Sequence, residues 1–177
     1  NVSGSGNYIG GLVGKSEDHV SDSYATGNVS GSDSIAGLVG YNGGGIISNS
    51  YATGDISGTY KAAGLVGYIN YGLVLNSYAT GNISGIYNVG GLAGYSYNGE
   101  VSNSFWDTQT SGQTSSAGGT GKTTAEMKDF PTFFNSGCDF ICETQNGVTD
   151  TWGINEDGAG NGGYPFLAWQ MYINKLT

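Results

Sequence analysis

The sequence of 177 residues repeats itself every 27 residues, and this period constrains the fold more than any other feature. A Ser-Tyr-Ala-Thr-Gly segment begins at Ser23, Ser50 and Ser77, and a degenerate copy begins at Ser104. Segments of the Gly-Leu-Val-Gly and Asn-Val-Ser-Gly types recur at the same spacing, with a single interval of 26. Such a period indicates a repeat architecture, and it is too short for helix-pair repeats of about 34 residues or propeller blades of about 40. Leucine-rich repeats fit poorly, since the Leu-x-x-Leu-x-Leu spacing is missing.

Each unit holds three short β-compatible segments, and none of them is long enough to be a stable strand by itself. If each unit forms one turn of a solenoid, equivalent residues stack about 4.8 Å apart and pair their backbones with the neighbouring coils. We therefore predict an all-β fold for residues 1–104, a parallel β-solenoid (β-helix) of about four 27-residue coils. The general preference of parallel crossovers predicts that it is right-handed.

Stacking also predicts rows of equivalent side chains, one from each coil. Three apolar rows are expected inside the solenoid: Leu12, Leu38, Leu65 and Leu92; Val20, Ile47, Val74 and Val101; and Val2, Val29, Ile56 and Ile83. An aromatic row is formed by Tyr24, Tyr51, Tyr78 and Phe105, and an amide row by Asn49, Asn76 and Asn103, with Asp22 in the first coil. Stacked rings and amide ladders stabilise parallel coils. The period does not decide whether the aromatic row faces inward.

Composition excludes several classes of protein. With 34 glycines and 2 prolines, the chain is neither collagen, which needs abundant proline, nor a helical bundle, which glycine destabilises. The net charge of -9 and the absence of arginine argue against nucleic acid and anionic membrane surfaces as partners. No apolar run of about 18 residues could insert into a membrane. An apolar content of 37% still favours folding over disorder. The repeated glycines are expected at corners with positive φ, or where two backbones approach closely.

Residues 105–177 break the period and are predicted to form a C-terminal cap over the last coil, since solenoids need an atypical terminal unit. The Thr-x-x-Glu pattern of Thr123 and Glu126 is a capping box, which predicts a short helix through Lys128 that ends before Pro131. Two apolar segments, 152–154 and 164–169, are expected to form short strands against the final coil.

Two small clusters in the cap invite a chemical interpretation. Cys138 and Cys142 lie four residues apart and would close a small disulfide loop in an oxidising compartment, with free buried thiols as the alternative. An acidic, glycine-rich segment offers Asn155, Asp157 and Asn161 as calcium ligands, although it fails the EF-hand spacing, and an ordinary turn is the alternative. Three Asn-x-Ser sequons, at Asn1, Asn28 and Asn82, fall at one phase of the coil.

No catalytic constellation is found, and we expect a protein that is not an enzyme and has no cofactor beyond the possible calcium. The single histidine, His19, cannot supply the two zinc ligands of a His-Glu-x-x-His peptidase, and it has no nucleophile elbow beside it. The segment 118–123 departs from the phosphate-binding P-loop pattern, because Ser116 stands where glycine is required, and is expected to be a flexible loop. The acids of the repeats do not recur in phase as pairs, as polysaccharide hydrolysis would require.

The tandem Gly-Leu-Val-Gly and Ser-Tyr-Ala-Thr-Gly units resemble the GLUG-motif repeats of secreted bacterial and archaeal surface proteins. These include filamentous-haemagglutinin-like adhesins and the non-catalytic parts of some IgA-cleaving metallopeptidases. Segments 105–112, 121–127 and 164–170 are similar to the region that often follows such repeats, while 138–150 looks like an insertion. The resemblance implies no catalytic residues.

The resemblance implies an extracellular or cell-surface module that acts in adhesion or as a structural scaffold. Its partners would be a protein or a glycan at a cell surface. One alternative is a self-assembling subunit of a filament or surface layer, because Asn1 begins a repeat unit without a cap and an open coil edge invites another chain. A second alternative is a carbohydrate-binding or polysaccharide-active β-helix.

Overall fold

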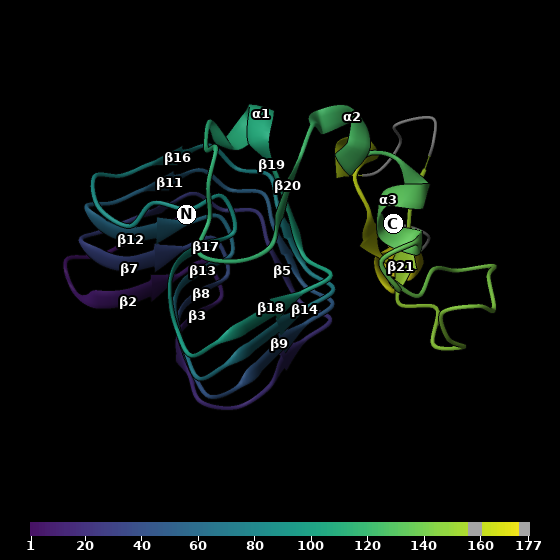
Figure 1. Ribbon diagram of the computed structural model, residues 1–177, viewed down its shortest axis with the longest axis horizontal. Coiled ribbons are helices and arrows are strands. Elements are labelled where there is room, and N and C mark those ends of the chain that lie inside the picture. The colour runs from purple at the N-terminus through teal and green to yellow at the C-terminus, as the bar shows by residue number, and fades with distance from the viewer. Residues whose placement is uncertain (156–160, 174–177) are drawn as a thin grey trace.

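The computed structural model describes residues 1–155 and 161–173, and it confirms the parallel β-solenoid of about four coils (Figure 1). Successive coils are offset by 27 residues, so that Tyr51 pairs with Tyr24 on one side and with Tyr78 on the other. Five parallel sheets run along the solenoid, where the sequence indicated three segments per coil. The fourth coil joins the second sheet only through isolated bridges at Tyr87 and Gly90.

The strands are short and are grouped here by sheet. The first sheet holds β1 (Val2–Ser3), β6 (Val29–Ser30), β11 (Ile56–Ser57) and β16 (Ile83–Ser84). The second holds β2 (Asn7–Gly10), β7 (Asp33–Ala36) and β12 (Tyr60–Ala63), and the third β3 (Val13–Ser16), β8 (Val39–Gly43), β13 (Val66–Asn70) and β17 (Ala93–Tyr97). The fourth holds β4 (Val20–Ser21), β9 (Ile46–Ser48), β14 (Leu73–Leu75) and β18 (Glu100–Ser102). The fifth, called the β5 sheet, holds β5 (Tyr24–Ala25), β10 (Tyr51–Ala52), β15 (Tyr78–Ala79), β19 (Phe105–Asp107) and β20 (Thr120–Lys122).

The amide row forms the corner that leads into the β5 sheet. Asp22, Asn49, Asn76 and Asn103 have φ of 48°, 47°, 46° and 48°, a left-handed conformation that Asn and Asp tolerate better than most residues. Their side chains also bond along the row, since Asn49 Nδ2 donates to Asp22 Oδ1 at 3.2 Å. The row therefore turns the chain and links the coils.

The glycines of the Gly-Leu-Val-Gly segments serve close approach between coils, the second of the two roles expected for them. A Cβ on Gly37 would lie 2.3 Å from the carbonyl oxygen of Gly64. A Cβ on Gly64 would lie 2.5 Å from both the carbonyl oxygen of Gly91 and Ala79 Cβ. None of these glycines has a positive φ, and the segment spans a bend between two strands rather than forming one.

The interior rows are buried as predicted, except at the first coil. Leu38, Leu65 and Leu92 are fully buried in the core, together with Ile47 and Val74. The corresponding side chains of the first coil are not: Leu12 is 50% exposed and Val2 is 37% exposed. These two positions correct the prediction, because each has a neighbouring coil on one side only.

The serine of each Ser-Tyr-Ala-Thr-Gly segment connects two coils. Ser50 Oγ donates to the carbonyl oxygen of Ser48 at 2.7 Å and accepts from the backbone N–H of Ser23 at 3.2 Å. Ser77 repeats both bonds one coil later. Backbone groups at this corner are thus paired, as buried polar groups require.

Residues 105–122 continue the solenoid and cross its last coil. After β19, the helix α1 (Thr108–Ser111) starts at Asp107 and ends at Gly112, which has φ of 66°. Ser116 Oγ then accepts bonds from the backbone N–H groups of Leu92 and Ala93, and Gly119 packs on Leu92. Thr120–Lys122 pairs with β19 as β20, so the loop predicted for this glycine-rich segment is corrected to a strand.

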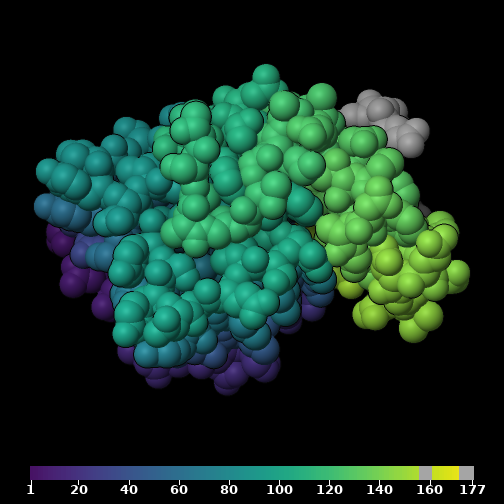
Figure 2. All heavy atoms as spheres, viewed as in Figure 1, coloured from purple at the N-terminus to yellow at the C-terminus, as the bar shows by residue number. Residues whose placement is uncertain are grey.

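The described residues from 123 onward form a C-terminal lobe beside the β5 sheet rather than over the end of the solenoid (Figures 1 and 2). It contains α2 (Thr124–Met127), α3 (Phe130–Phe134), β21 (Trp152–Gly153), a 3-10 turn (Asn161–Gly163), β22 (Phe166–Leu167) and α4 (Gln170–Ile173). The predicted capping box is present at Thr123 and Glu126, and α2 ends before Pro131 as expected. A second helix, α3, carries Pro131 in its first turn, where proline is tolerated.

The two predicted strands of the lobe are β21 and β22, which pair with each other in antiparallel register. They were expected against the final coil. Trp152 and Leu167 instead pack with Tyr51 and Tyr78, which belong to the second and third coils. The lobe therefore covers a side of the solenoid, because its apolar residues find the aromatic row there.

Candidate binding surfaces

The aromatic row of the β5 sheet faces away from the solenoid interior and is covered by the C-terminal lobe. We call Tyr24, Tyr51, Tyr78 and Phe105 the covered row. Tyr51 and Tyr78 stack at 5.1 Å between ring centroids with planes 3° apart, and both are about fully buried. Met127, Phe133, Phe140 and Trp152 of the lobe pack around them. This row holds the lobe and leaves no room for a ligand along its buried part.

Hydroxyl groups of the covered row are bonded to the lobe. Asn161 Nδ2 donates to Tyr78 Oη at 2.6 Å, and this hydroxyl donates to the carbonyl oxygen of Pro165. Tyr51 Oη bonds to the side-chain amide of Gln170. Burial raises the pKa of Tyr51 to about 12 and that of Tyr78 well above its usual value. Both rings therefore stay neutral at physiological pH.

Asp107 links the last coil to the lobe. Its buried carboxylate accepts from the backbone N–H groups of Gln109 and Thr110, at 2.9 and 3.1 Å, and from Tyr164 Oη at 2.7 Å. Burial raises the pKa of Asp107, but the hydrogen bonds, including those with Thr124 and Tyr164, outweigh it and hold the pKa below its usual value. The charged carboxylate is thus part of the folded structure.

A second row of tyrosines lies on the third sheet and is open to solvent. Tyr41, Tyr68 and Tyr95 are register partners on β8, β13 and β17, and we call them the open row. Their ring centroids lie 5.2 and 5.3 Å apart, with planes at 82° and 58°. Tyr8 extends the row at 4.7 Å from Tyr41. Tyr8 and Tyr95 are each 38% exposed, while the two central rings are half-buried.

Polar groups flank the open row on both sides. Asn70 Nδ2 donates to Tyr41 Oη at 3.0 Å, while Lys61 Nζ bonds to Asp33 Oδ1 at 2.7 Å and lies 5.8 Å from the centre of the Tyr68 ring. Burial raises the pKa of Asp33, yet hydrogen bonds from Lys61 and a neighbouring serine outweigh it and keep the pKa below its usual value. The row therefore joins apolar ring surface to fixed donors and acceptors.

Sequence reasoning missed the open row. The signal was present, because Tyr41, Tyr68 and Tyr95 each follow a Gly-Leu-Val-Gly-type segment directly and lie 27 residues apart. Lys15 takes this place in the first coil, and its ammonium group lies 5.7 Å from the centre of the Tyr41 ring. Attention to the residue after each landmark would have found the row.

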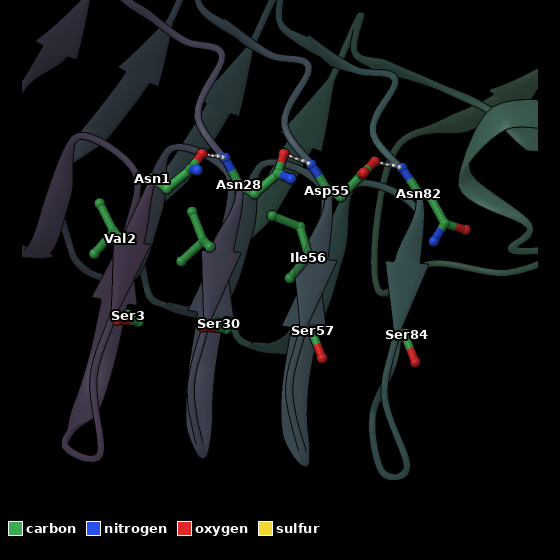
Figure 3. Close-up of a pocket in the computed structure, with 11 residues that line it drawn as sticks. Asn1, Val2, Ser3, Asn28, Ser30, Asp55, Ile56, Ser57, Asn82 and Ser84 are labelled. Atoms are coloured by element: carbon green, nitrogen blue, oxygen red, sulfur yellow. Dashed lines mark hydrogen bonds between the residues drawn. The ribbon is translucent and has the colours of Figure 1, made fainter.

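A shallow groove of about 370 Å³ runs along the first sheet (Figure 3). Asn1, Asn28, Asp55 and Asn82 form one edge, and each of the first three accepts a bond through Oδ1 from the backbone N–H of the next, at 2.9, 2.9 and 3.0 Å. The three sequon asparagines thus lie in one exposed row, as their phase predicted. The bonds show that Asn1 and Asn28 connect coils.

The two cysteines are free thiols, so the expected disulfide between Cys138 and Cys142 is not present in the structure. Cys138 is buried among the aromatic residues of the lobe, whereas Cys142 is exposed at a residue with φ of 68°. Their different surroundings explain the correction, because the first side chain packs into the lobe core and the second faces solvent. Burial raises the pKa of Cys138 to about 11.

The calcium prediction stays a prediction. Asp157 lies outside the described residues, and Asn161 directs its amide nitrogen to Tyr78 and Pro165. Within 1–155 and 161–173, no group of three or more His, Cys, Asp and Glu side chains could hold a metal ion. His19 lies in an exposed loop, where its backbone N–H donates to Asp18 Oδ1. None of the helices in these ranges is long and apolar enough to cross a membrane.

Comparison with protein families gives one match. The model of the GLUG motif matches residues 5–30 and 31–57, and each match covers about one coil of the solenoid. The matched units contain the first two Gly-Leu-Val-Gly segments. Comparisons with curated proteins and with solved structures gave no match.

Proposed function

From the premise that the chain carries GLUG repeats wound into a β-solenoid, we propose that it is a non-catalytic adhesion module of a secreted or cell-surface protein. The observation that carries the proposal is the open row. Three coils present a tyrosine at the same position, and no part of the described C-terminal lobe packs on it. Tyrosine supplies broad amphipathic contact area at low conformational cost, which suits a binding surface.

The surroundings of the open row favour binding over catalysis. The carboxylates beside it, Asp33 and Glu17, are each ion-paired with a lysine, at 2.7 Å in both pairs. Acid–base chemistry on a glycoside would need two carboxyl groups facing one another across a bond. We therefore assign the row a role in contact rather than turnover, and incubation with a polysaccharide panel should release no reducing sugar.

The test is adhesion by the purified protein. We expect it to co-sediment with insoluble cell-wall or extracellular-matrix material, and we expect a Tyr41→Ser/Tyr68→Ser variant to lose at least tenfold in bound protein. Tyr87→Ser is the matched control, since Tyr87 is 54% exposed and stacks on Tyr60 instead of the open row. Failure of the wild type to bind any such material, or equal binding by the double variant, would refute the proposal. Antibody labelling of intact cells of the source organism tests the surface location.

Self-association is the second candidate, and the exposed apolar side chains of the first coil favour it. Leu12 and Val2 lie where another coil would bury their counterparts. A coil from a second copy could pair with this edge. Sedimentation velocity over a wide concentration range is the test: we expect larger species that Leu12→Asp removes, and a single monomeric species at all concentrations would dismiss this candidate.

A further inference from the structure

We infer that the open row binds an extended, neutral polysaccharide, which lies parallel to the solenoid axis with its sugar rings against Tyr41, Tyr68 and Tyr95. The inference rests on the proposed adhesion function and gives it a ligand class. It follows from the ring geometry, from the polar groups beside the rings and from the charge of the surface.

The ring planes of the open row leave ring faces available. In the covered row, neighbouring planes are 15° and 3° apart, so each ring covers the face of the next. In the open row the planes at Tyr8, Tyr41, Tyr68 and Tyr95 turn by 42°, 82° and 58° between neighbours. A turned ring meets its neighbour with an edge, and its own face stays free on the solvent side. The C–H face of a sugar packs on such an aromatic surface.

The spacing of the rings suits a polymer. One tyrosine per coil gives centroid separations of 5.2 and 5.3 Å along the axis, and successive sugar rings of an extended polysaccharide follow one another at a comparable spacing. Several weak contacts on one chain raise the overall affinity through effective concentration. A repeat protein thereby supplies a repeated subsite without any deep pocket.

The polar groups match the edge of a sugar ring. Asn70 offers both a donor and an acceptor beside Tyr41 and Tyr68, and the Lys61–Asp33 pair lies on the other side of Tyr68. Sugar hydroxyls both donate and accept, so they can bond to an amide, an ammonium and a carboxylate held in place. A few fixed polar groups around an apolar surface orient a ligand in this way.

The charge of the surface favours a neutral ligand. The protein carries a net charge of -9, which repels an anionic polymer. The two lysines beside the open row, Lys15 and Lys61, are already paired with Glu17 and Asp33. Both ammonium groups also lie near tyrosine rings, where they oppose the approach of a cationic polymer.

Affinity electrophoresis of the full chain through gels containing one polysaccharide each, followed by calorimetry, tests the inference. The probes are hydroxyethylcellulose and xyloglucan as extended neutral chains, hyaluronate as an anionic chain and chitosan as a cationic chain. We expect retardation by the neutral chains only. Tyr68→Ala should weaken binding at least tenfold, and Asn70→Ala should weaken it less, while Tyr87→Ala should bind like the wild type. Urea denaturation of each variant verifies that it is folded, and the Asn70 variant remains informative if Tyr68→Ala unfolds.

The outcomes separate the ligand class from the adhesion function. Binding to hyaluronate or chitosan alone, or neutral binding that Tyr68→Ala leaves unchanged, would overturn the inference. No retardation by any polysaccharide, together with row-dependent binding to an insoluble surface, would also overturn it and leave the adhesion proposal standing. Absence of binding in both assays would remove both.

Discussion

The covered row and the open row are built on the same 27-residue ladder and yet differ in every property that matters for function. Tyr51 and Tyr78 stack with planes 3° apart, are buried by the C-terminal lobe and bond to it through their hydroxyls. Tyr41 and Tyr68 meet at 82°, remain partly exposed and bond to polar neighbours on their own sheet. A stacked row of tyrosines is therefore not by itself a binding surface, since what lies over it decides its role.

The difference has a simple physical origin. Burying an aromatic side chain removes 150–250 Å² of surface from water, roughly, and parallel stacking leaves one smooth face for the lobe to cover. The lobe supplies Phe133, Trp152 and Leu167 for that purpose. The repeat thus provides identical ladders on several faces, and the non-repeating segment selects the one that becomes core.

The largest expected effect is loss of a ring from the covered row. Tyr78→Ala removes a fully buried ring that contacts Phe133, Trp152 and Tyr164, and should lower the free energy of unfolding by about 3–5 kcal/mol. Tyr95→Ala, at the exposed end of the open row, should cost about 1 kcal/mol or less. Urea denaturation followed by circular dichroism measures both, and similar losses in the two variants would show that the rows do not differ as described.

Asp107 tests the attachment of the lobe to the last coil. Asp107→Asn should lower the free energy of unfolding at pH 7 by about 1.5–3 kcal/mol, the range for hydrogen bonds to a charged group. Because the folded-state pKa of Asp107 lies below the unfolded value, its contribution is present above about pH 4 and is lost as pH falls through the folded pKa.

The wild type and Asp107→Asn should therefore converge in stability at acid pH. Urea midpoints between pH 3 and pH 7, roughly the window set by the unfolded carboxyl pKa, check this. Asp18→Asn, which changes an almost fully exposed carboxylate, is the control and should follow the wild type throughout. A constant difference between wild type and Asp107→Asn at every pH would contradict the assignment.

The close approach of coils beneath both rows predicts a smaller loss. Gly64→Ala places a Cβ 2.5 Å from Gly91 O and from Ala79 Cβ, and should destabilise by about 1–3 kcal/mol because the coils must move apart. Gly6→Ala is the matched control, since a Cβ there meets nothing within 4 Å. Thermal unfolding compares the two, and equal melting temperatures would mean that the coils yield without cost.

Much of this fold could be predicted because the repeat states the same instruction four times. The 27-residue offset predicted the register of Tyr24, Tyr51 and Tyr78, and the pattern of Thr123 and Glu126 predicted the capped helix. Both signals are local or periodic, so they need no knowledge of distant parts of the chain.

The rest depended on contacts between segments far apart in sequence. Whether Tyr78 faces a lobe or solvent is decided by residues such as Trp152 and Pro165, which no period connects to it. Leu12 has the same sequence context as Leu38 and differs only in lacking a second neighbouring coil. The open row was missed for a different reason, because Tyr68 follows the glycine landmark instead of belonging to it.

The smallest perturbation is a chemical label that reports on the cover itself. Cys142 is exposed and should react with iodoacetamide in the folded protein, while Cys138 is buried under the lobe, with its pKa raised to about 11, and should react only when the lobe opens. Mass spectrometry should therefore find one adduct in native buffer and two in denaturing urea.

Combining the label with Tyr78→Ala sharpens the comparison of the two rows. Loss of the ring beneath the lobe should speed labelling of Cys138, because fewer contacts then oppose local opening, whereas Tyr95→Ala should leave its rate unchanged. Labelling that needs a reductant for both thiols would instead reveal a disulfide. Equal acceleration by both variants would mean that the open row, too, supports the lobe.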